Sequence, residues 1–151
     1  VLIQTYRPDH YGIVQAARQD YRAFYEEEIL YRKLGGYPPV IHMMAILITS
    51  PDEKRGEALS GRIACLIKEQ MPPCAGHCDI QKDEIAREVT LIGPARASIG
   101  KINDIYRFLL YCKSPKYHCL TKIKDQVERY WESAGIKEEN IQFDFDPVGS
   151  I

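Results

Sequence analysis

The chain has 151 residues, 45% hydrophobic and 27% charged, which are the proportions of one soluble globular domain with a core of its own. Twenty basic and twenty-one acidic residues give a formal net charge of −1, so nucleic-acid binding would need a local patch rather than an overall positive field. No apolar run is long enough to span a membrane and no secretory signal opens the sequence. With five cysteines, an odd number, these features favour a reducing, cytoplasmic setting.

The first third of the sequence has the features of a helical extension ahead of a compact domain. Residues 1–6 are predicted to form a short strand, and because it begins at the first residue we expect the chain to be part of a longer polypeptide. A weak helical segment over residues 9–19 is followed by a stronger helix over residues 20–34, which Asp20 is suited to cap and a Gly-Gly pair to end. The Tyr-Pro-Pro sequence that follows enforces an extended link, so the compact domain is predicted to start at residue 40.

A strand–helix–strand unit is predicted next. Residues 40–49 are apolar and typical of a strand. Ser50, Pro51 and Glu53 then supply a cap, a proline at the first helical position and an acidic residue three places after the cap. The helix that follows has its apolar residues at helical spacing: Leu59, Ile63, Leu66 and Ile67. A Pro- and Gly-containing loop over residues 71–82 leads to a second strand over residues 87–92.

The same order of elements is repeated in the last third. A strand is predicted over residues 105–113, Ser114-Pro115 is typical of a helix start, and Gly135 of a helix end. Between them, one helical face carries Leu120, Ile123, Val127, Tyr130 and Trp131. Residues 141–146 alternate apolar and polar side chains, as a half-buried strand does.

Two strand–helix–strand units in tandem predict an α+β fold of the split βαβ, or ferredoxin-like, type. Its four-stranded antiparallel sheet has both helices on one face, here preceded by the helical extension. The other face of such a sheet stays uncovered unless a partner or the extension covers it.

A basic segment joins the two units. A polar loop after Gly93-Pro94 carries Arg96 and Lys101, and it leads into the strand that carries Arg107. Basic side chains on a loop that feeds a strand favour binding rather than catalysis.

Signatures of several catalytic classes are missing. The sequence contains neither GxxxxGK[ST] nor GxGxxG for phosphates, and neither GxSxG nor HExxH for hydrolysis. Cys74, His77 and Cys78 form half of a metal site at most, since zinc takes four ligands, and we interpret them as a reduced loop. Asp144 and Asp146 lie two apart on a predicted strand and share a face, which is more typical of a solvated or docking surface than of acid–base catalysis.

Five segments in order carry a family resemblance: VLIQTYRPDH, DYRAFYEEEILYRKLGGYPP, GPARASI, YRFLLYCKSP and FDFDPVGSI. Together they resemble the C-terminal domain of the primosomal protein N′ family, the bacterial replication-restart DNA helicases. The resemblance implies a longer protein that unwinds DNA in the 3′–5′ direction with ATP and magnesium and holds structural zinc. It places the ATP-binding lobes and the zinc cysteines upstream, so this chain is expected to be no enzyme and to bind no cofactor.

The resemblance also implies what this part of the protein does. Residues 1–39 would be the exit strand of the upstream helicase lobe and a connector arm, and residues 40–151 the C-terminal domain. The arm would dock on the helicase lobes through Tyr21, Phe24, Tyr25, Arg32 and Tyr37. The expected partners are forked or single-stranded DNA, single-stranded-DNA-binding protein and other primosome proteins.

Two sites follow residue by residue from the resemblance. The expected DNA contacts are Arg96, Lys101, Tyr106 and Arg107. The chain departs from the family at Asp104, a carboxylate beside these cations where relatives often have arginines. The acidic tail of single-stranded-DNA-binding protein is expected at the start of the second helix, on Lys116, Tyr117 and Thr121. The alternatives are a purely structural docking module and a small enzyme that uses Asp144 and Asp146.

Overall fold

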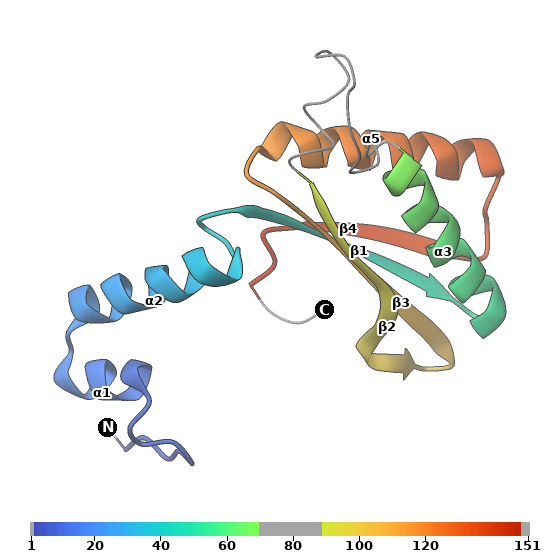
Figure 1. Cartoon of the computed structure of the whole chain (residues 1–151). Coiled ribbons are helices and arrows are strands. Elements are labelled where there is room, and N and C mark those ends of the chain that lie inside the picture. Colours follow the sequence, from blue (N-terminus) through green and yellow to red (C-terminus); the bar gives the residue numbers. More distant parts are fainter. Residues whose placement is uncertain (1, 70–88, 149–151) are drawn as a thin grey trace. The chain divides into compact units, whose positions relative to one another are not determined.

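A computed structural model describes residues 2–69 and 89–148. The chain divides into two compact units, an N-terminal unit, Val1–Val40, and a C-terminal unit, Ile41–Ile151 (Figure 1). The predicted loop over residues 71–82, with Cys74, His77 and Cys78, lies outside the described residues.

The N-terminal unit consists of α1, Tyr11–Arg18, and α2, Tyr21–Gly35. As the sequence predicts, the Asp20 carboxylate caps α2, where its Oδ1 accepts a hydrogen bond from the Ala23 N–H at 2.9 Å. Gly36 ends α2 in the left-handed conformation, with φ of 58°, which glycine adopts without strain. The predicted strand over residues 1–6 is wrong for residues 2–6, because they pair with no other strand and a strand needs such a partner.

Aromatic side chains make the contact between α1 and α2. The Tyr11 hydroxyl donates to the Glu28 carboxylate, and the Tyr11 ring stacks on Phe24 and Tyr31 at centroid distances of 6.2 Å and 5.3 Å. That hydrogen bond raises the pKa of Tyr11 to about 12 and lowers the pKa of Glu28. A hydrogen bond from Arg32 to Glu28 lowers the pKa of this carboxyl group as well. No residue of either helix is buried, so the unit has no core of its own.

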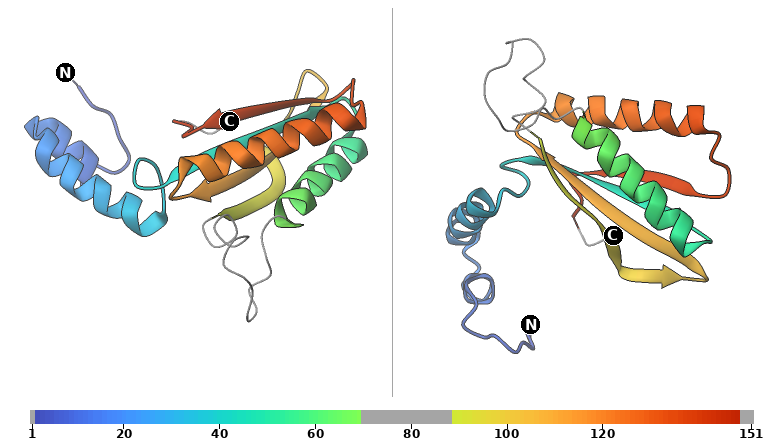
Figure 2. Two further views of the ribbon diagram at one scale, coloured as in Figure 1. Left: turned by 90° about the horizontal axis from the view of Figure 1, so that it is seen from above. Right: turned by 45° about the vertical axis from the view of Figure 1, so that its right-hand side comes forward.

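The C-terminal unit has the predicted split βαβ fold. Its elements are β1, His42–Ser50; α3, Glu53–Glu69; β2, Thr90–Ile102; β3, Ile105–Ser114; α5, Tyr117–Ala134; and β4, Asn140–Phe145. The four strands form one sheet in the order β2-β3-β1-β4, and every neighbouring pair is antiparallel. Both helices of this unit, α3 and α5, lie on the same face of the sheet, so neither of them covers the other face (Figures 1 and 2).

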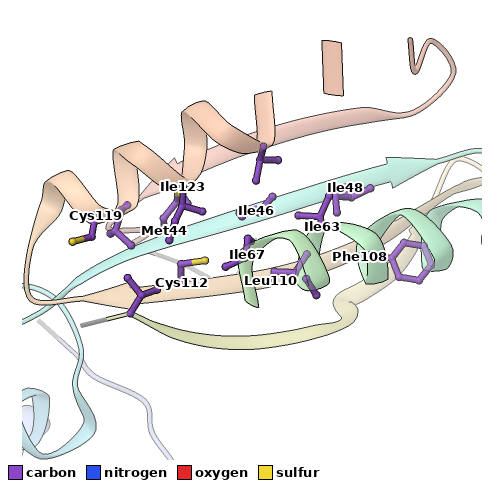
Figure 3. Packing of buried hydrophobic residues seen from close by; sticks show 14 of the residues in the cluster. Met44, Ile46, Ile48, Ile63, Ile67, Phe108, Leu110, Cys112, Cys119 and Ile123 are labelled. Atoms are coloured by element: carbon purple, nitrogen blue, oxygen red, sulfur yellow. The ribbon is translucent and has the colours of Figure 1, made fainter. Parts of the chain in front are cut away.

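The main core lies between that sheet face and the two helices (Figure 3). Strands β1 and β3 alternate, so Met44, Ile46 and Ile48 of β1 point toward the helices. The other buried members come from α3, β3, α5 and the residue that precedes β2: Leu59, Ile63, Ala64, Ile67, Val89, Phe108, Leu110, Cys112, Cys119, Leu120, Ile123 and Val127. The predicted apolar faces of both helices are thus confirmed.

The segment predicted as a polar loop after Gly93 is instead strand. Strand β2 continues to Ile102 and pairs with β3, which gives its backbone groups partners that a loop would lack. The register of the pairing shifts at two places, between Ile92 and Ala95 and between Arg96 and Lys101. The first shift contains the Gly-Pro pair, and at the second β2 has more residues than the facing part of β3. Asn103 and Asp104 then close a two-residue hairpin with φ of 50° and 63°, a conformation that these residue types tolerate.

Both helices of the C-terminal unit begin two residues later than their Ser-Pro pairs predict. The cap of α3 is Asp52, whose Oδ1 accepts a hydrogen bond from the Arg55 N–H at 2.8 Å, while the Ser50 hydroxyl accepts from the Asp52 N–H. Lys116 occupies the cap of α5 without a side-chain cap bond, and the Ser114 hydroxyl accepts from its N–H. The serines therefore shape the turns that lead into the helices.

Candidate functional site

The four expected DNA contacts are divided between the two faces of the sheet. Paired residues of antiparallel strands point to the same face, and Arg96 pairs with Phe108, a core residue on the helix side. Lys101 pairs with Tyr106, which also packs against the helix-side core, and the Lys101 ammonium lies 4.8 Å from the Tyr106 ring centroid. Lys101 and Tyr106 are therefore brought together.

Arg107 points to the opposite face. It follows Tyr106 directly on β3 and pairs with Thr49 of β1. Its Nη1 donates to the Ile99 carbonyl at 3.5 Å, across the irregular part of β2. Among residues 2–69 and 89–148, no carboxylate forms an ion pair with it.

Carboxylates of the chain partly neutralise the other two cations. Arg96 pairs with Glu53 in the first turn of α3, although the Arg96 side chain stays 66% exposed. The Lys101 ammonium lies 2.8 Å from Asp104 Oδ1, and this hydrogen bond raises the pKa of Lys101 and lowers the pKa of Asp104. The departure noted in the sequence, Asp104, thus acts directly on an expected DNA contact.

The expected acidic-tail site lies at the first turn of α5. Tyr117 opens the helix, is 46% exposed, and contacts the rings of His42 and Phe145 at centroid distances of 5.4 Å and 5.1 Å. Lys116 precedes it at the cap. Thr121 lies one turn later, and its hydroxyl donates to the His118 carbonyl at 2.9 Å, so Thr121 is bound to its own helix.

A carboxylate that the sequence analysis assigned to a solvated or docking face is part of the same surroundings. Asp146 Oδ1 accepts a hydrogen bond from the Met43 N–H at 2.8 Å, and Oδ2 lies 3.2 Å from His42 Nδ1. Asp144 remains exposed on β4. The two carboxylates therefore have different environments, and in the described part of the chain no three His, Cys, Asp or Glu side chains gather as metal ligands would.

The expected docking residues of the N-terminal unit differ in exposure. Tyr21 is 74% exposed, and Tyr25 and Tyr37 are both 49% exposed, whereas Phe24 is half-buried. Arg32 is held within the unit, because its Nε lies 2.6 Å from Glu28 Oε1 and its Nη1 donates to the Pro38 carbonyl at 2.6 Å. An apolar hollow of about 330 Å³ lies between α1 and α2 and is lined by Gly12, Gln15, Ala16, Gln19, Asp20, Tyr21 and Phe24.

A basic depression of about 300 Å³ on α3 was missed by the sequence analysis. Lys54, Arg55 and Arg62 line it, together with the largely buried Glu139. Arg55 binds both Glu138 and Glu139, the latter at 3.0 Å. The i, i+7 spacing of the two arginines on a helix was the available signal, but the carboxylate partners of Arg55 lie more than eighty residues away in the sequence.

Comparison with known proteins accounts for most of the chain. The family model described as the primosomal protein N C-terminal domain matches residues 33–148. The chain belongs to this family. The primosomal protein N C-terminal domain therefore comprises the whole described part of the C-terminal unit and the end of α2.

Replication restart proteins of several bacteria are similar to this member of the primosomal protein N family. Replication restart protein PriA of Bacillus subtilis (strain 168) is 26% identical over 97% of this chain and 17% of its own length. The protein of the same name from Borreliella burgdorferi is 26% identical over 100% of this chain and 20% of its own length. That of Thermotoga maritima is 38% identical over 89% of this chain and 15% of its own length. The chain thus spans about a fifth or less of these relatives.

Solved structures also resemble this member of the primosomal protein N family, and a designed protein is one of them. The de novo designed protein Foldit4 superposes with a TM-score of 0.48 at 11% identity, over 70% of this chain and 94% of that chain. A likeness at this level carries no argument about fold or function. Among the described residues, no helix has the length and apolar character needed to cross a membrane.

Proposed function

We propose that the chain is the DNA- and partner-binding C-terminal part of a replication restart protein. Family membership and the similarity to replication restart proteins support a role in restarting replication forks. The DNA substrate would be forked or single-stranded. The catalytic work, ATP-driven unwinding with magnesium, and the structural zinc would belong to other parts of a longer cytoplasmic protein.

The observation that carries the DNA-binding proposal is the position of Arg107. It is the one cation among the three expected contacts that forms no ion pair with a described carboxylate, so its charge is available to a phosphate. Lys101 and the Tyr106 ring add a cation beside an aromatic surface, the combination that single strands bind.

A titration tests the DNA-binding proposal. Labelled forked and single-stranded DNA are mixed with the 151-residue chain at two salt concentrations, and fluorescence anisotropy gives the affinity. We expect Arg107→Ala to weaken binding and to reduce the salt slope by roughly 0.7, the value for one phosphate contact on a single strand. Absence of salt-dependent binding below the high micromolar range would contradict the proposal.

Asp104 offers a second variant with an opposite expectation. Asp104→Asn removes the charge that Lys101 contacts but keeps a residue type that accepts the positive φ of the hairpin turn. We expect DNA to bind up to about five-fold more tightly, since an exposed ion pair of this kind is worth roughly 0.2–1 kcal/mol. Lys101→Ala removes the positive partner of the same ion pair and is expected to weaken DNA binding. Equal affinities for both variants would remove Lys101 from the DNA site.

We also propose that the start of α5 binds the acidic tail of single-stranded-DNA-binding protein. The N–H groups of a helix start attract a carboxylate, and Lys116 and the exposed Tyr117 lie beside them. The test uses an acidic peptide with a free C-terminal carboxylate and its amidated form, titrated by calorimetry. We expect the free acid to bind more tightly and Lys116→Ala to remove the difference. Equal binding of both peptide forms would contradict a carboxylate site.

A structural docking role is the second candidate, and the N-terminal unit favours it. Neither of its helices buries a residue, and Tyr21, Tyr25 and Tyr37 remain exposed. Exposed aromatic surface of this kind is typical of a contact with another domain. In this version the chain binds no DNA and packs on the helicase lobes of the longer protein. The anisotropy titration separates the two candidates, because a purely structural module shows no salt-dependent binding.

The proposal that catalysis belongs elsewhere has its own test. Purified chain is incubated with ATP, magnesium and single-stranded DNA, and released phosphate is measured. Because the sequence has no phosphate-binding loop, we expect no hydrolysis above buffer. DNA-stimulated hydrolysis that survives further purification would overturn it.

A further inference from the structure

The sheet face opposite α3 and α5 carries a second, smaller apolar cluster. Its four members are buried: Ala45 and Leu47 of β1, Ala97 of β2 and Leu109 of β3. The half-buried Tyr111 packs against them. The two helices of the C-terminal unit, α3 and α5, both lie on the other side of the sheet (Figure 2).

Tyr111 has a central place on this face. Tyr111 lies on β3, an inner strand of the sheet, and pairs with Ala45 on β1 and with Ile92 on β2. Its ring therefore has a small residue on one side and an exposed apolar residue on the other. It is the single aromatic residue that the described strands direct to this side, because the other four pack in the helix-side core: Tyr106, Phe108, Phe143 and Phe145. An aromatic ring on an inner strand of a four-stranded sheet is a platform on which a base can stack.

The charges on the face are arranged along β3. Arg107, Tyr111 and Lys113 lie on the same side of that strand, with Arg107 about 13 Å and Lys113 about 7 Å from the tyrosine at 3.3 Å per residue. The described residues of β2 that share this side are apolar or uncharged. Asp144 is the one carboxylate on the described strands of this face, and it lies at the other edge, on β4. The β2–β3 half is therefore suited to an anionic strand.

We infer that single-stranded DNA lies along β3 on this open face, with a base stacked on Tyr111 and phosphates at Arg107 and Lys113. The inference rests on the proposed DNA-binding function and assigns it to one surface. It separates Arg107 from Arg96 and Lys101, which point to the helix side. A single strand fits better than a duplex, since stacking requires an unpaired base.

Two tyrosine variants test the stacking contact. The 151-residue chain is titrated into a fluorescein-labelled 20-nucleotide oligothymidine. We expect Tyr111→Leu to weaken binding by about five-fold or more, because stacking of one base is worth roughly 1–3 kcal/mol. Tyr111→Phe keeps the ring and is expected to stay within about two-fold of the unchanged chain. A duplex of the same length is expected to bind more weakly than the single strand.

A charge variant has a matched control. Lys113→Ala is compared with Lys122→Ala, which removes the same charge from the exposed side of α5. We expect only Lys113→Ala to lower the affinity and the salt slope. If Tyr111→Leu and Lys113→Ala bind as the unchanged chain does while Lys101→Ala loses binding, the open face is wrong and the DNA-binding proposal stands. If the unchanged chain does not bind either oligonucleotide, both fail.

Photo-crosslinking of the unchanged chain avoids any dependence on how the variants fold. Oligothymidine is crosslinked by ultraviolet light and the protein is digested with trypsin. Cleavage after Lys101, Arg107 and Lys113 gives two separate peptides, residues 102–107 with Tyr106 and residues 108–113 with Tyr111. We expect the nucleotide on peptide 108–113. Crosslinks confined to peptide 102–107 or to the helices would overturn the inference.

Discussion

Single hydrogen-bonding residues hold the end of the sheet in place, and Asp146 is the main one. Its Oδ1 accepts from the Met43 N–H at 2.8 Å, and its own N–H donates to the Met43 carbonyl at 2.7 Å. Its φ of 48° is one that aspartate and asparagine tolerate better than most residues. We expect Asp146→Ala to lower the free energy of unfolding by about 1–3 kcal/mol, measured by urea denaturation, because the Met43 N–H loses its partner.

The controls for Asp146 separate charge from geometry. Asp146→Asn keeps an acceptor for the Met43 N–H and is expected to lose less stability than the alanine variant. Asp144→Ala removes an exposed carboxylate from the same strand and is expected to change the free energy of unfolding by no more than about 0.5 kcal/mol. A loss for Asp144→Ala as large as that for Asp146→Ala would contradict the assignment of the stabilising contact to the Asp146–Met43 hydrogen bond.

Buried thiols give a second prediction at the scale of residues. Cys112 and Cys119 are fully buried in the helix-side core, whereas Cys65 is exposed. Burial raises the pKa of the Cys112 thiol to about 12, so it stays protonated at pH 8 as well as inaccessible. We expect maleimide labelling at pH 8, followed by mass spectrometry of peptides, to modify Cys65 in native protein and Cys112 only after unfolding. Rapid labelling of Cys112 would contradict the packing of β3.

The raised pKa also has a consequence for stability. The unfolded thiol ionises near its ordinary value of about 8.5, whereas the folded thiol keeps its proton until about pH 12. The folded state therefore binds the proton more tightly, and the contribution of Cys112 to stability is complete below about pH 8.5 and falls as the pH rises toward 12.

At the scale of elements, two glycines of α3 make a matched pair. A Cβ on Gly56 would lie 2.5 Å from Phe108 Cε2 and 3.0 Å from Ser50 Cβ, so α3 approaches the sheet closely there. A Cβ on Gly61 would meet nothing within 4 Å. We expect Gly56→Ala to destabilise the chain by about 1–3 kcal/mol and Gly61→Ala to stabilise it by up to about 1 kcal/mol, measured as shifts in the urea midpoint. Equal effects would show that helix propensity, not the contact with β3, decides both.

The sequence predicted elements well where one physical signal dominates. The apolar stripe of α5, with Leu120, Ile123 and Val127, and its glycine end follow from local spacing and conformation, and both are confirmed. Strand β2 beyond Gly93 was missed because its pairing is decided by β3. A Gly-Pro pair followed by polar residues is typical of a loop, unless a neighbouring strand supplies partners for its backbone.

The candidate site shows the same limit more strongly. The sequence contains Arg96, Lys101 and Arg107 as one basic group, but the register of β2 and β3 places Arg107 on the other face. Moving a residue by one position along a strand places its side chain on the opposite face of the sheet. The amino-acid composition of a segment does not show which face that is. The importance of Asp146 was hidden for a similar reason, since its partners His42 and Met43 lie more than a hundred residues earlier.

At the scale of the whole molecule, the two units differ in what holds them together. The C-terminal unit packs two helices on a sheet around a core of fully buried side chains. The N-terminal unit has side-chain contacts but no buried residue, and two short helices are marginal in water without a core. Contact with a partner domain would therefore bury more of its exposed aromatic surface, and stabilise the unit more, than the contacts within the unit do.

Hydrogen exchange measures that difference directly. In the 151-residue chain we expect the amides of α2 to exchange within seconds to minutes, and those of β1, β3 and α5 to be protected for far longer. The reason is that local opening of a unit without a core requires little free energy. In the longer replication restart protein, docking of the exposed rings is expected to slow exchange in α2 and leave α5 unchanged. If α2 is already as protected as α5 in the chain alone, the N-terminal unit is stable by itself. If α2 exchanges equally fast in the longer protein, its aromatic surface does not dock there, and the structural module loses its main support.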